Sequence, residues 1–196
     1  MLQDGSASRT QRVKRKPYAK PTPSEIQAAR GSKLPDVLAP GLGVLFCGIN
    51  PGLYSAAVGC HFARPGNRFW KALHGSGFTP RRLEPWEQMD LIDYGCGLTN
   101  LVGRTTAAER ELDDEELVRG RRHLIRKVRR YEPRIVAILG LGAFRTAFQR
   151  KVTLGPQQNM IDNSRLWVLP NPSGLNAHYQ LPELNRLFGE LRNAAG

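Results

Sequence analysis

Gly43-Val44-Leu45-Phe46-Cys47-Gly48-Ile49 is a short apolar run that ends in turn residues, which is the pattern of a strand buried in a parallel sheet. Similar runs at Ile135–Leu139 and Leu166–Leu169 predict two more buried strands, and Leu98–Val102 predicts a further short one. Helical patterns lie between and after these runs, at Asn67–Gly77, Trp86–Tyr94, Asp113–Tyr131, Ala143–Gln149 and Leu181–Arg192. This alternation predicts an α/β fold with a mainly parallel sheet between two helical layers.

The chain carries a large excess of positive charge. Its 196 residues include 29 Lys and Arg against 17 Asp and Glu, which gives a formal net charge of +12 and a pI near 10.3. A field of this sign concentrates polyanions and speeds their capture. Nucleic acid is therefore the first candidate partner, and an anionic membrane surface is the second.

Cysteine usage and hydropathy bear on the compartment and on cofactors. No segment approaches the roughly 18 apolar residues of a membrane span, and the first residues lack the apolar core of a secretory signal. The three cysteines have no paired spacing, and the four histidines show no zinc spacing. We therefore expect a cytoplasmic protein without a membrane partner, which uses no metal and no other cofactor.

Residues 1–34 differ in composition from the rest of the chain. They combine Ser, Thr, Pro and Gln with Lys and Arg, and large apolar side chains are few. Two interpretations stay open, a disordered solubilising tail and an arm that holds DNA through salt-dependent contacts. The pattern also allows a short helix around Ser24–Arg30 with Ser24 as its N-cap. Residues 35–196 are expected to form one globular domain.

Three segments are expected at the edge of the sheet where ligands bind, just beyond the carboxyl ends of the strands. They are residues 48–55, 95–100 and 170–176. The first and the third both contain an Asn-Pro pair with glycine close behind it. The chain has no Walker loop, dinucleotide fingerprint or serine nucleophile elbow. Two loops of the same kind at one edge predict that the functional site lies there.

Five short motifs occur in order along the chain: Gly48-Ile49-Asn50-Pro51-Gly52, Phe62, Asn67-Arg68-Phe69-Trp70, Thr99-Asn100-Leu101-Val102 and Asn171-Pro172-Ser173-Gly174-Leu175. Together they resemble the mismatch-specific uracil-DNA glycosylases, the bacterial relatives of thymine-DNA glycosylase. The similarity runs from about Pro35 to the C-terminus. It implies a three-layer α/β/α fold and excision of uracil opposite guanine from double-stranded DNA, without cofactor and usually as a monomer.

The resemblance implies a wedge in the third segment. A base inside a duplex is unreachable, so such an enzyme rotates the nucleotide out of the helix. Leu175 matches the side chain that fills the vacated space, which offsets part of the unstacking cost. Ser173, Gly174 and Asn176 flank it, and small residues let the backbone approach DNA closely. These four residues form the expected DNA-binding set.

The resemblance also implies a pocket for the flipped base. Phe62 matches the residue that stacks on uracil, and Ile49 shapes the pocket beside it. Ser55 and Asn171 complete the expected substrate-binding set. Gly52 stands where stricter uracil-DNA glycosylases have a Tyr that blocks a 5-methyl group. We therefore expect tolerance for pyrimidines with 5-substituents and for larger damaged bases.

Two residues are candidates for the catalytic step. Asn50 matches the residue that positions the attacking water, and an amide orients water but has almost no basicity. From the residues alone, we hypothesise that a second group compensates and that this group is Asp93, the acid nearest to the central glycine segment. A helix cap or a salt bridge is the competing interpretation of Asp93.

The sequence departs from the family pattern after the wedge, where Asn176-Ala177 stands in place of Ser and Arg. Because the Arg grips the orphaned guanine, we expect weak discrimination of the opposite base. The leading interpretation is a monofunctional glycosylase that leaves an abasic site, since no lysine stands in the three edge motifs. The alternative is a damaged-DNA-binding module with little or no catalysis, which Asn50 favours. An RNA-binding protein would leave Leu175 and Phe62 unexplained.

Overall fold

The computed structural model describes residues 17–196. Its core is one five-stranded sheet in the order β2-β1-β3-β5-β4. The strands are β1 (Val44–Gly48), β2 (Cys96–Asn100), β3 (Ile135–Leu139), β4 (Gly155–Ile161) and β5 (Ser164–Leu169). All neighbouring strands are parallel except β4, which pairs antiparallel with β5. The predicted α/β fold with a mainly parallel sheet is thereby confirmed.

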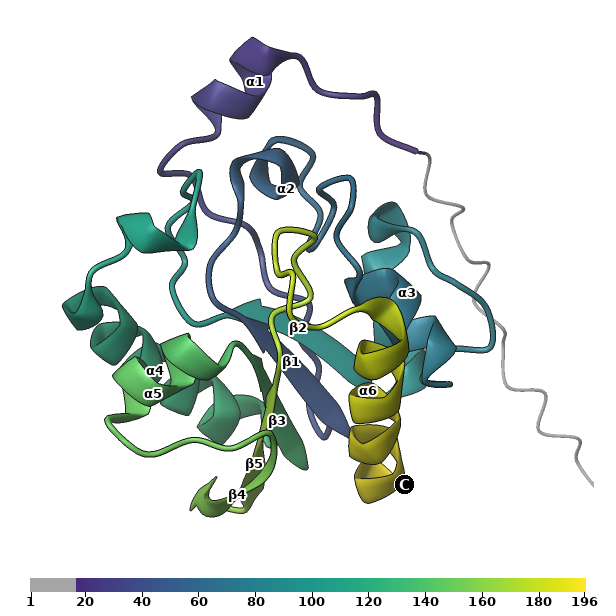
Figure 1. Cartoon of the computed structure of the whole chain (residues 1–196), viewed down its shortest axis with the longest axis vertical. Helices are drawn as coiled ribbons and strands as arrows, with labels where there is room; N and C mark the ends of the chain where they lie inside the picture. Colours follow the sequence, from purple (N-terminus) through teal and green to yellow (C-terminus); the bar gives the residue numbers. More distant parts are fainter. Residues whose placement is uncertain (1–16) are drawn as a thin grey trace, which may run out of the picture.

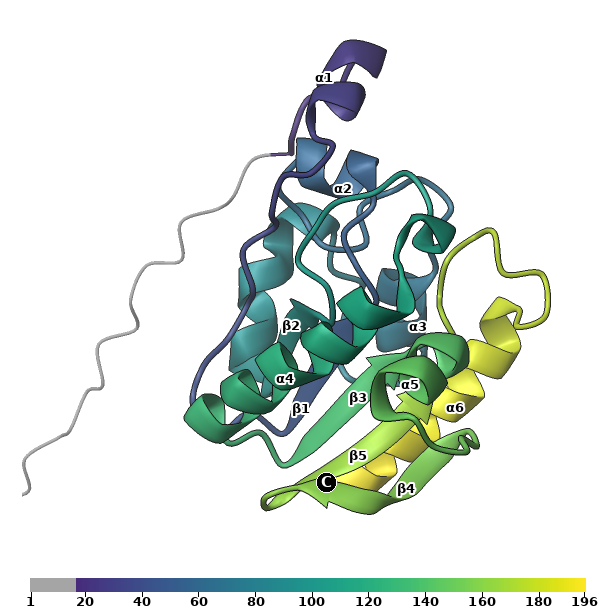
Figure 2. The ribbon, with the colours of Figure 1, turned by 90° about the vertical axis from the view of Figure 1, so that its left-hand side faces the viewer.

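Helices cover both faces of the sheet (Figures 1 and 2). One face packs against α3 (Phe69–Gly75), η1 (Pro85–Tyr94) and α6 (Leu181–Ala195), and the other against α4 (Asp114–Tyr131) and α5 (Leu141–Phe148). Successive residues of a strand point to opposite faces, so Phe46 joins the first core and Leu45 the second. Because both faces are covered, the central strands are apolar throughout, which explains why the apolar runs in the sequence predict them.

Helix α4 shows how local sequence sets an element that supports the site. The Asp113 carboxylate accepts a hydrogen bond from the Glu116 N–H, and the Glu116 carboxylate accepts one from the Asp113 N–H, so a capping box starts the helix. Gly120 lies against the end of β2, where an added Cβ would stand 2.5 Å from the Leu101 carbonyl oxygen. This glycine therefore allows the helix to pack directly on the chain that leaves β2.

Two differences from the sequence-based elements matter. β2 begins at Cys96 and ends at Asn100, two residues earlier than predicted at both ends. β4 was not predicted, because Gly155-Pro156-Gln157-Gln158 has the composition of a turn. The pairing of β4 with β5 is interrupted by a register shift between Pro156 and Met160. At the other edge of the sheet, Val37 makes an isolated antiparallel bridge with Leu98 of β2.

The segment before β1 is structured from residue 17 onward. The N-cap of helix α1 (Pro23–Ala28) is Thr22, whereas the sequence suggested Ser24. The Thr22 hydroxyl accepts a hydrogen bond from Glu25 N, and the Glu25 carboxylate accepts one from Thr22 N. Ala29 and Leu34 are buried. Tyr18 packs edge-on against Trp86 with ring centroids 5.5 Å apart. Part of the predicted tail is thus packed on the domain, and its residues 1–16 lie outside the described range.

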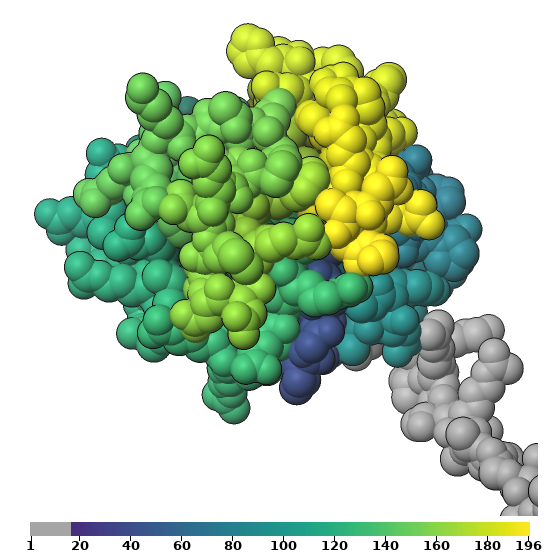
Figure 3. All heavy atoms as spheres, turned by 90° about the horizontal axis from the view of Figure 1, so that it is seen from below, coloured from purple at the N-terminus to yellow at the C-terminus, as the bar shows by residue number. Residues whose placement is uncertain are grey.

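The two ends of the sheet differ in what surrounds them. Helix α2 (Leu53–Ala57) and the loops after β2 and β5 gather at the carboxyl ends of the parallel strands (Figure 1). At the opposite end of the sheet, the surface seen in Figure 3 contains the end of α6 and the β4–β5 hairpin. Within residues 17–196, no helix is long and apolar enough to cross a membrane. The same residues contain no cluster of three or more His, Cys, Asp or Glu suited to a metal ion.

Candidate functional site

A cavity of about 500 Å³ lies at the carboxyl ends of the parallel strands. Its lining comes from the end of β1 and the turn into α2, from the loop between α2 and α3, from the ends of β2 and β3, and from the loops after β2 and β5. Leu34 from the N-terminal segment also contributes. This is the edge of the sheet at which the sequence placed the site.

Glycines make the floor of the cavity compact. A Cβ at Gly48 would lie 2.6 Å from Asn100 Oδ1 and 3.3 Å from the Phe62 ring. A Cβ at Gly140 would lie 2.8 Å from the end of the Ile49 side chain. These positions therefore need glycine if Asn100, Phe62 and Ile49 are to reach the cavity together.

Asn50 is half-buried and its amide is held in one orientation. Its Nδ2 donates to Thr106 Oγ1 at 2.7 Å and to the carbonyl oxygens of Arg104 and Pro51, both at 3.2 Å. The Thr106 hydroxyl donates to Ala108 O, so its oxygen accepts from Asn50. Asn50 Oδ1 has no hydrogen bond to a residue that the structure describes. The amide is thus fixed with its acceptor oxygen available to a ligand or to water.

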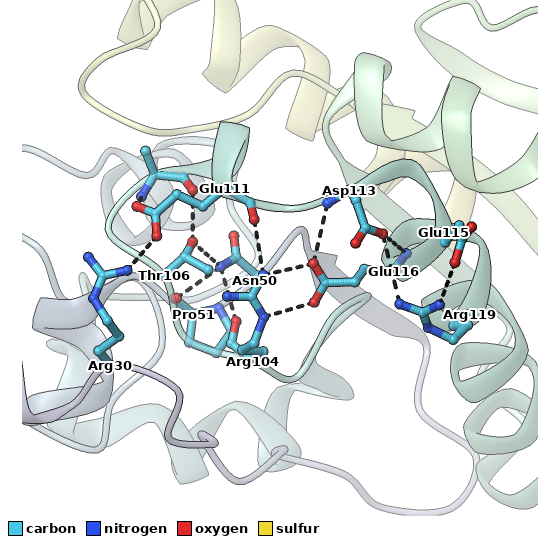
Figure 4. Close-up of polar contacts among 11 residues, drawn as sticks. Arg30, Asn50, Pro51, Arg104, Thr106, Glu111, Asp113, Glu115, Glu116 and Arg119 are labelled. Atoms are coloured by element: carbon cyan, nitrogen blue, oxygen red, sulfur yellow. Dashed lines mark hydrogen bonds and ion pairs between the residues drawn. The ribbon is translucent and has the colours of Figure 1, made fainter.

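We call Asn50 together with residues 101–113 the Asn50 wall. Ion pairs brace it from two directions (Figure 4). Arg104 donates to both carboxylate oxygens of Glu116 on α4, at 2.8 and 2.7 Å, and these bonds lower the pKa of Glu116 to about 2. Arg30 pairs with Glu111 at 2.5 Å, and the Gly31 N–H donates to Thr105 O. The N-terminal segment and α4 therefore hold this loop between them.

Phe62 and His61 form the neighbouring wall. Phe62 has φ +53°, which is uncommon for a bulky residue, and its ring stacks on Phe69 with centroids 4.2 Å apart. His61 is buried, and desolvation lowers its pKa. Its Nε2 lies 2.9 Å from Pro35 O and therefore carries the proton, which leaves Nδ1 to accept from Asn100 Nδ2 at 3.4 Å. This contact orients the Asn100 amide at the cavity.

The loop after β5, residues 170–180, forms the Leu175 wall. Asn171 Oδ1 accepts from Ser173 N, and Asn176 Nδ2 donates to Asn171 O. The Ser173 hydroxyl oxygen accepts from Leu175 N at 3.3 Å. Leu175 itself is 75% exposed although it lines the cavity mouth. The loop thus presents a large apolar side chain to solvent on an internally bonded turn.

Within residues 17–196, Glu109 is the only Asp or Glu that lines the cavity. The residue as a whole is exposed, but enough protein surrounds its carboxyl group that desolvation raises the pKa. A hydrogen bond with the Asn171 side chain acts in the opposite direction. Glu109 therefore connects the Asn50 wall to the Leu175 wall and brings one titratable carboxyl group to the cavity.

The structure brings together most of the residues that the sequence selected. The cavity is lined by Ile49, Asn50, Gly52, Ser55, Phe62, Asn171, Ser173, Leu175 and Asn176. The Ser55 hydroxyl accepts a hydrogen bond from Ala63 N at 3.1 Å, and it thereby supports the chain next to Phe62. A Cβ at Gly52 would meet no atom within 4 Å, so the position is open. Gly174 lies beside Gly66, where a Cβ would stand 2.6 Å from the Gly66 carbonyl oxygen.

Asp93 is the exception, and its expected place at the cavity is wrong. The residue is exposed in η1, directly before β2, and it does not line the cavity. Gly95 accepts a hydrogen bond from Val44, the first residue of β1, whereas Asn100 pairs with Gly48 at the other end. Asp93 therefore stands at the amino end of the sheet. The sequence-based segment 95–100 spans the whole strand and reaches the cavity only at Asn100.

Several cavity residues received no role from the sequence, among them Asn100, Thr106 and Glu109. Asn100 was part of a motif, and the strand end at this position is the signal that identifies it. Thr106 and Glu109 lie in a loop whose path depends on ion pairs to distant residues. No periodicity in the sequence points to that path.

A comparison with known families agrees with this geometry. Residues 35–194 match the family model described as the uracil DNA glycosylase superfamily. The match covers the sheet, both helical layers and every cavity residue except Leu34.

Proposed function

Because the chain belongs to the uracil DNA glycosylase superfamily, whose members are DNA glycosylases, we propose that it excises uracil and other damaged pyrimidines from mispaired duplex DNA. The proposed reaction hydrolyses the N-glycosidic bond and leaves an abasic site. The observation that carries the proposal is that Asn50, Phe62 and the exposed Leu175 line one cavity. These three supply a water-orienting amide, an aromatic face and an apolar wedge.

Base recognition would use Phe62 and Asn100. The Phe62 ring provides a stacking surface of a kind that contributes about 1–3 kcal/mol per base. The Asn100 amide, oriented by His61, leaves an oxygen that can accept from an N–H of the pyrimidine edge. His61 is suited to this supporting role because its lowered pKa keeps the ring neutral near pH 7.

Bond cleavage would proceed by addition of water to the sugar. The water oxygen forms a bond to C1′, the bond from C1′ to the base nitrogen breaks, and the electron pair leaves with the base. Asn50 Oδ1 accepts a hydrogen bond from the water and so orients it without taking a proton. An ionised Glu109 would accept the proton that the water loses and stabilise positive charge on the sugar, and the departing base anion would take up a proton from solvent. None of the described residues that line the cavity is a lysine, so water is the nucleophile in this proposal.

Substrate range would follow from the openness of two positions. Gly52 leaves room for a 5-substituent on the pyrimidine. Asn176 uses its side-chain oxygen to accept from His178 N and its amide group to donate to Asn171 O. With both groups engaged inside the loop, Asn176 offers little to an orphaned base. We therefore expect weak preference for guanine opposite the lesion.

Single-turnover excision tests the proposal. Labelled duplexes with U·G, U·A and T·G pairs, together with single-stranded uracil DNA, are incubated with excess protein and then cleaved with alkali at abasic sites. Release from U·G and U·A at similar rates is the expected result. Binding of uracil DNA without release from any substrate would contradict the proposal and would favour a damaged-DNA-binding module.

A further inference from the structure

The Leu175 wall carries the proposed wedge and needs contacts with the rest of the domain to hold it in place. Residues 170–180 stand out between β5 and α6 (Figure 2), and Leu175 is 75% exposed. Hydrogen bonds within the loop shape the turn around Asn171 and Ser173 but do not connect it to the sheet. A side chain that must enter a base stack works best when its backbone is already ordered, because ordering it during binding costs affinity.

Arg68 provides contacts on both sides of the wedge. Its Nη2 donates to the carbonyl oxygens of Ser173 and Asn176, at 2.5 and 2.7 Å, and its Nη1 donates to Tyr179 O at 2.6 Å. The first two carbonyls flank Leu175. A planar guanidinium can reach three carbonyls at fixed angles, which a compact ammonium cannot.

The backbone reinforces the same junction. Arg68 N donates to Pro172 O at 2.9 Å. Gly174 approaches Gly66 so closely that a Cβ would be 2.6 Å from its carbonyl oxygen. Phe69, which follows Arg68 in the chain, is fully buried and stacks on Phe62. Arg68 thus joins the Leu175 wall to the core and to the aromatic wall of the cavity.

We propose that Arg68 is a positioning residue that fixes Leu175 in the orientation required for insertion into duplex DNA. This inference rests on the proposed glycosylase function. It gives Arg68 a role in extracting the base and none in breaking the bond. Loss of Arg68 therefore affects paired substrates, whereas a base in single-stranded DNA reaches the cavity without a wedge.

The test compares duplex U·G with single-stranded uracil DNA in single-turnover excision. Misplacement of a positioned group by about 1 Å can cost on the order of 100-fold in rate. We expect Arg68→Gln to lower duplex excision by about 10- to 100-fold and single-strand excision by less than about threefold. Arg68→Lys should fall between Arg68→Gln and the wild type on the duplex. In a Leu175→Ala background, Arg68→Gln should cause no further loss on the duplex.

Arg165→Gln is the matched control, because Arg165 also donates to a backbone carbonyl, that of Ala194, at the far end of the sheet. It should leave both rates unchanged. Equal losses on both substrates, no loss on either, or a further loss in the Leu175→Ala background would each overturn the inference. If Arg68→Gln does not fold, Arg68→Lys carries the comparison. A wild-type protein that releases no base would refute the proposed function, while the fluorescence of 2-aminopurine beside the lesion would still report whether Arg68 controls wedge insertion.

Discussion

The Asn50 wall and the Leu175 wall face the same cavity but are held by different forces. Charged pairs brace the Asn50 wall, between Arg104 and Glu116 and between Arg30 and Glu111. The guanidinium that holds the Leu175 wall, that of Arg68, donates to neutral backbone carbonyls. Ion pairs respond to pH and salt, whereas bonds to carbonyls respond to pH much less. We therefore expect the two walls to fail under different conditions and on different substrates.

The largest effect is expected at the centre of the Asn50 wall. Asn50→Ala removes the only group of this wall that we assign to orienting water. Loss of one preorganised group of this kind typically costs about 100- to 1,000-fold in rate. The loss should be equal on duplex and single-stranded uracil DNA, measured by single-turnover excision. A loss confined to the duplex would make Asn50 part of base extraction and would remove the distinction between the walls.

Glu109 belongs to the Asn50 wall and bonds to Asn171 of the Leu175 wall, and its charge is the second target. Because its pKa is raised, the wild-type rate should fall on acidification at a higher pH than for an ordinary carboxyl group. Glu109→Gln keeps an acceptor for Asn171 but loses the charge. We expect at least about a tenfold lower rate near neutral pH and loss of the acidic limb of the pH profile. An unchanged profile in the variant would exclude Glu109 from the chemical step.

Thr106→Val tests whether the orientation of Asn50 matters. The change removes the acceptor 2.7 Å from Asn50 Nδ2 and leaves a side chain of similar shape. The variant loses the hydrogen bond from Asn50 and the one to Ala108 O. Loss of the bond from Asn50 predicts about a three- to tenfold lower rate on both substrates. Thr79→Val is the matched control, since Thr79 is equally buried and its hydroxyl has no partner among the described residues. A similar loss in both variants would indicate a general packing effect.

Glu116→Gln addresses the bracing ion pair through stability. The pKa of Glu116 is depressed to about 2, so the pair stabilises the folded state above the ordinary carboxyl pKa and loses this effect as pH falls toward 2. The groups are partly exposed, and such pairs contribute at most about 1 kcal/mol. We expect Tm to drop by no more than about 2–4 °C at pH 7. The difference from wild type should shrink below pH 4.5 in thermal unfolding, and a constant difference would contradict the ion-pair explanation.

The smallest effect is expected at Asp93. It stands at the amino end of the sheet, outside both walls. Asp93→Asn should therefore retain the wild-type excision rate within about twofold, which is much less than the effect of removing a general base. A large loss in a folded variant would return Asp93 to the catalytic set.

The sequence predicted the sheet well because its central strands are buried on both faces. β3 matches its predicted residues completely, and β1 differs by one residue at each end. The failure at Asp93 has a local cause. The sequence places the whole of segment 95–100 at the ligand-binding edge because it does not reveal that Val44 pairs with Cys96. This pairing makes residues 96–100 a strand that begins at the opposite end of the sheet. Thr106 and Glu109 could not be predicted, because their positions depend on ion pairs between residues far apart in sequence.

The two edges of the sheet also determine how this protein meets other polypeptides. An exposed edge strand offers unpaired N–H and C=O groups on which a strand of another chain can assemble. On β4, Pro156 lacks the N–H and the register shift breaks the ladder. On β2, Val37 already occupies the Leu98 position. Both edges therefore resist strand exchange and amyloid-like growth.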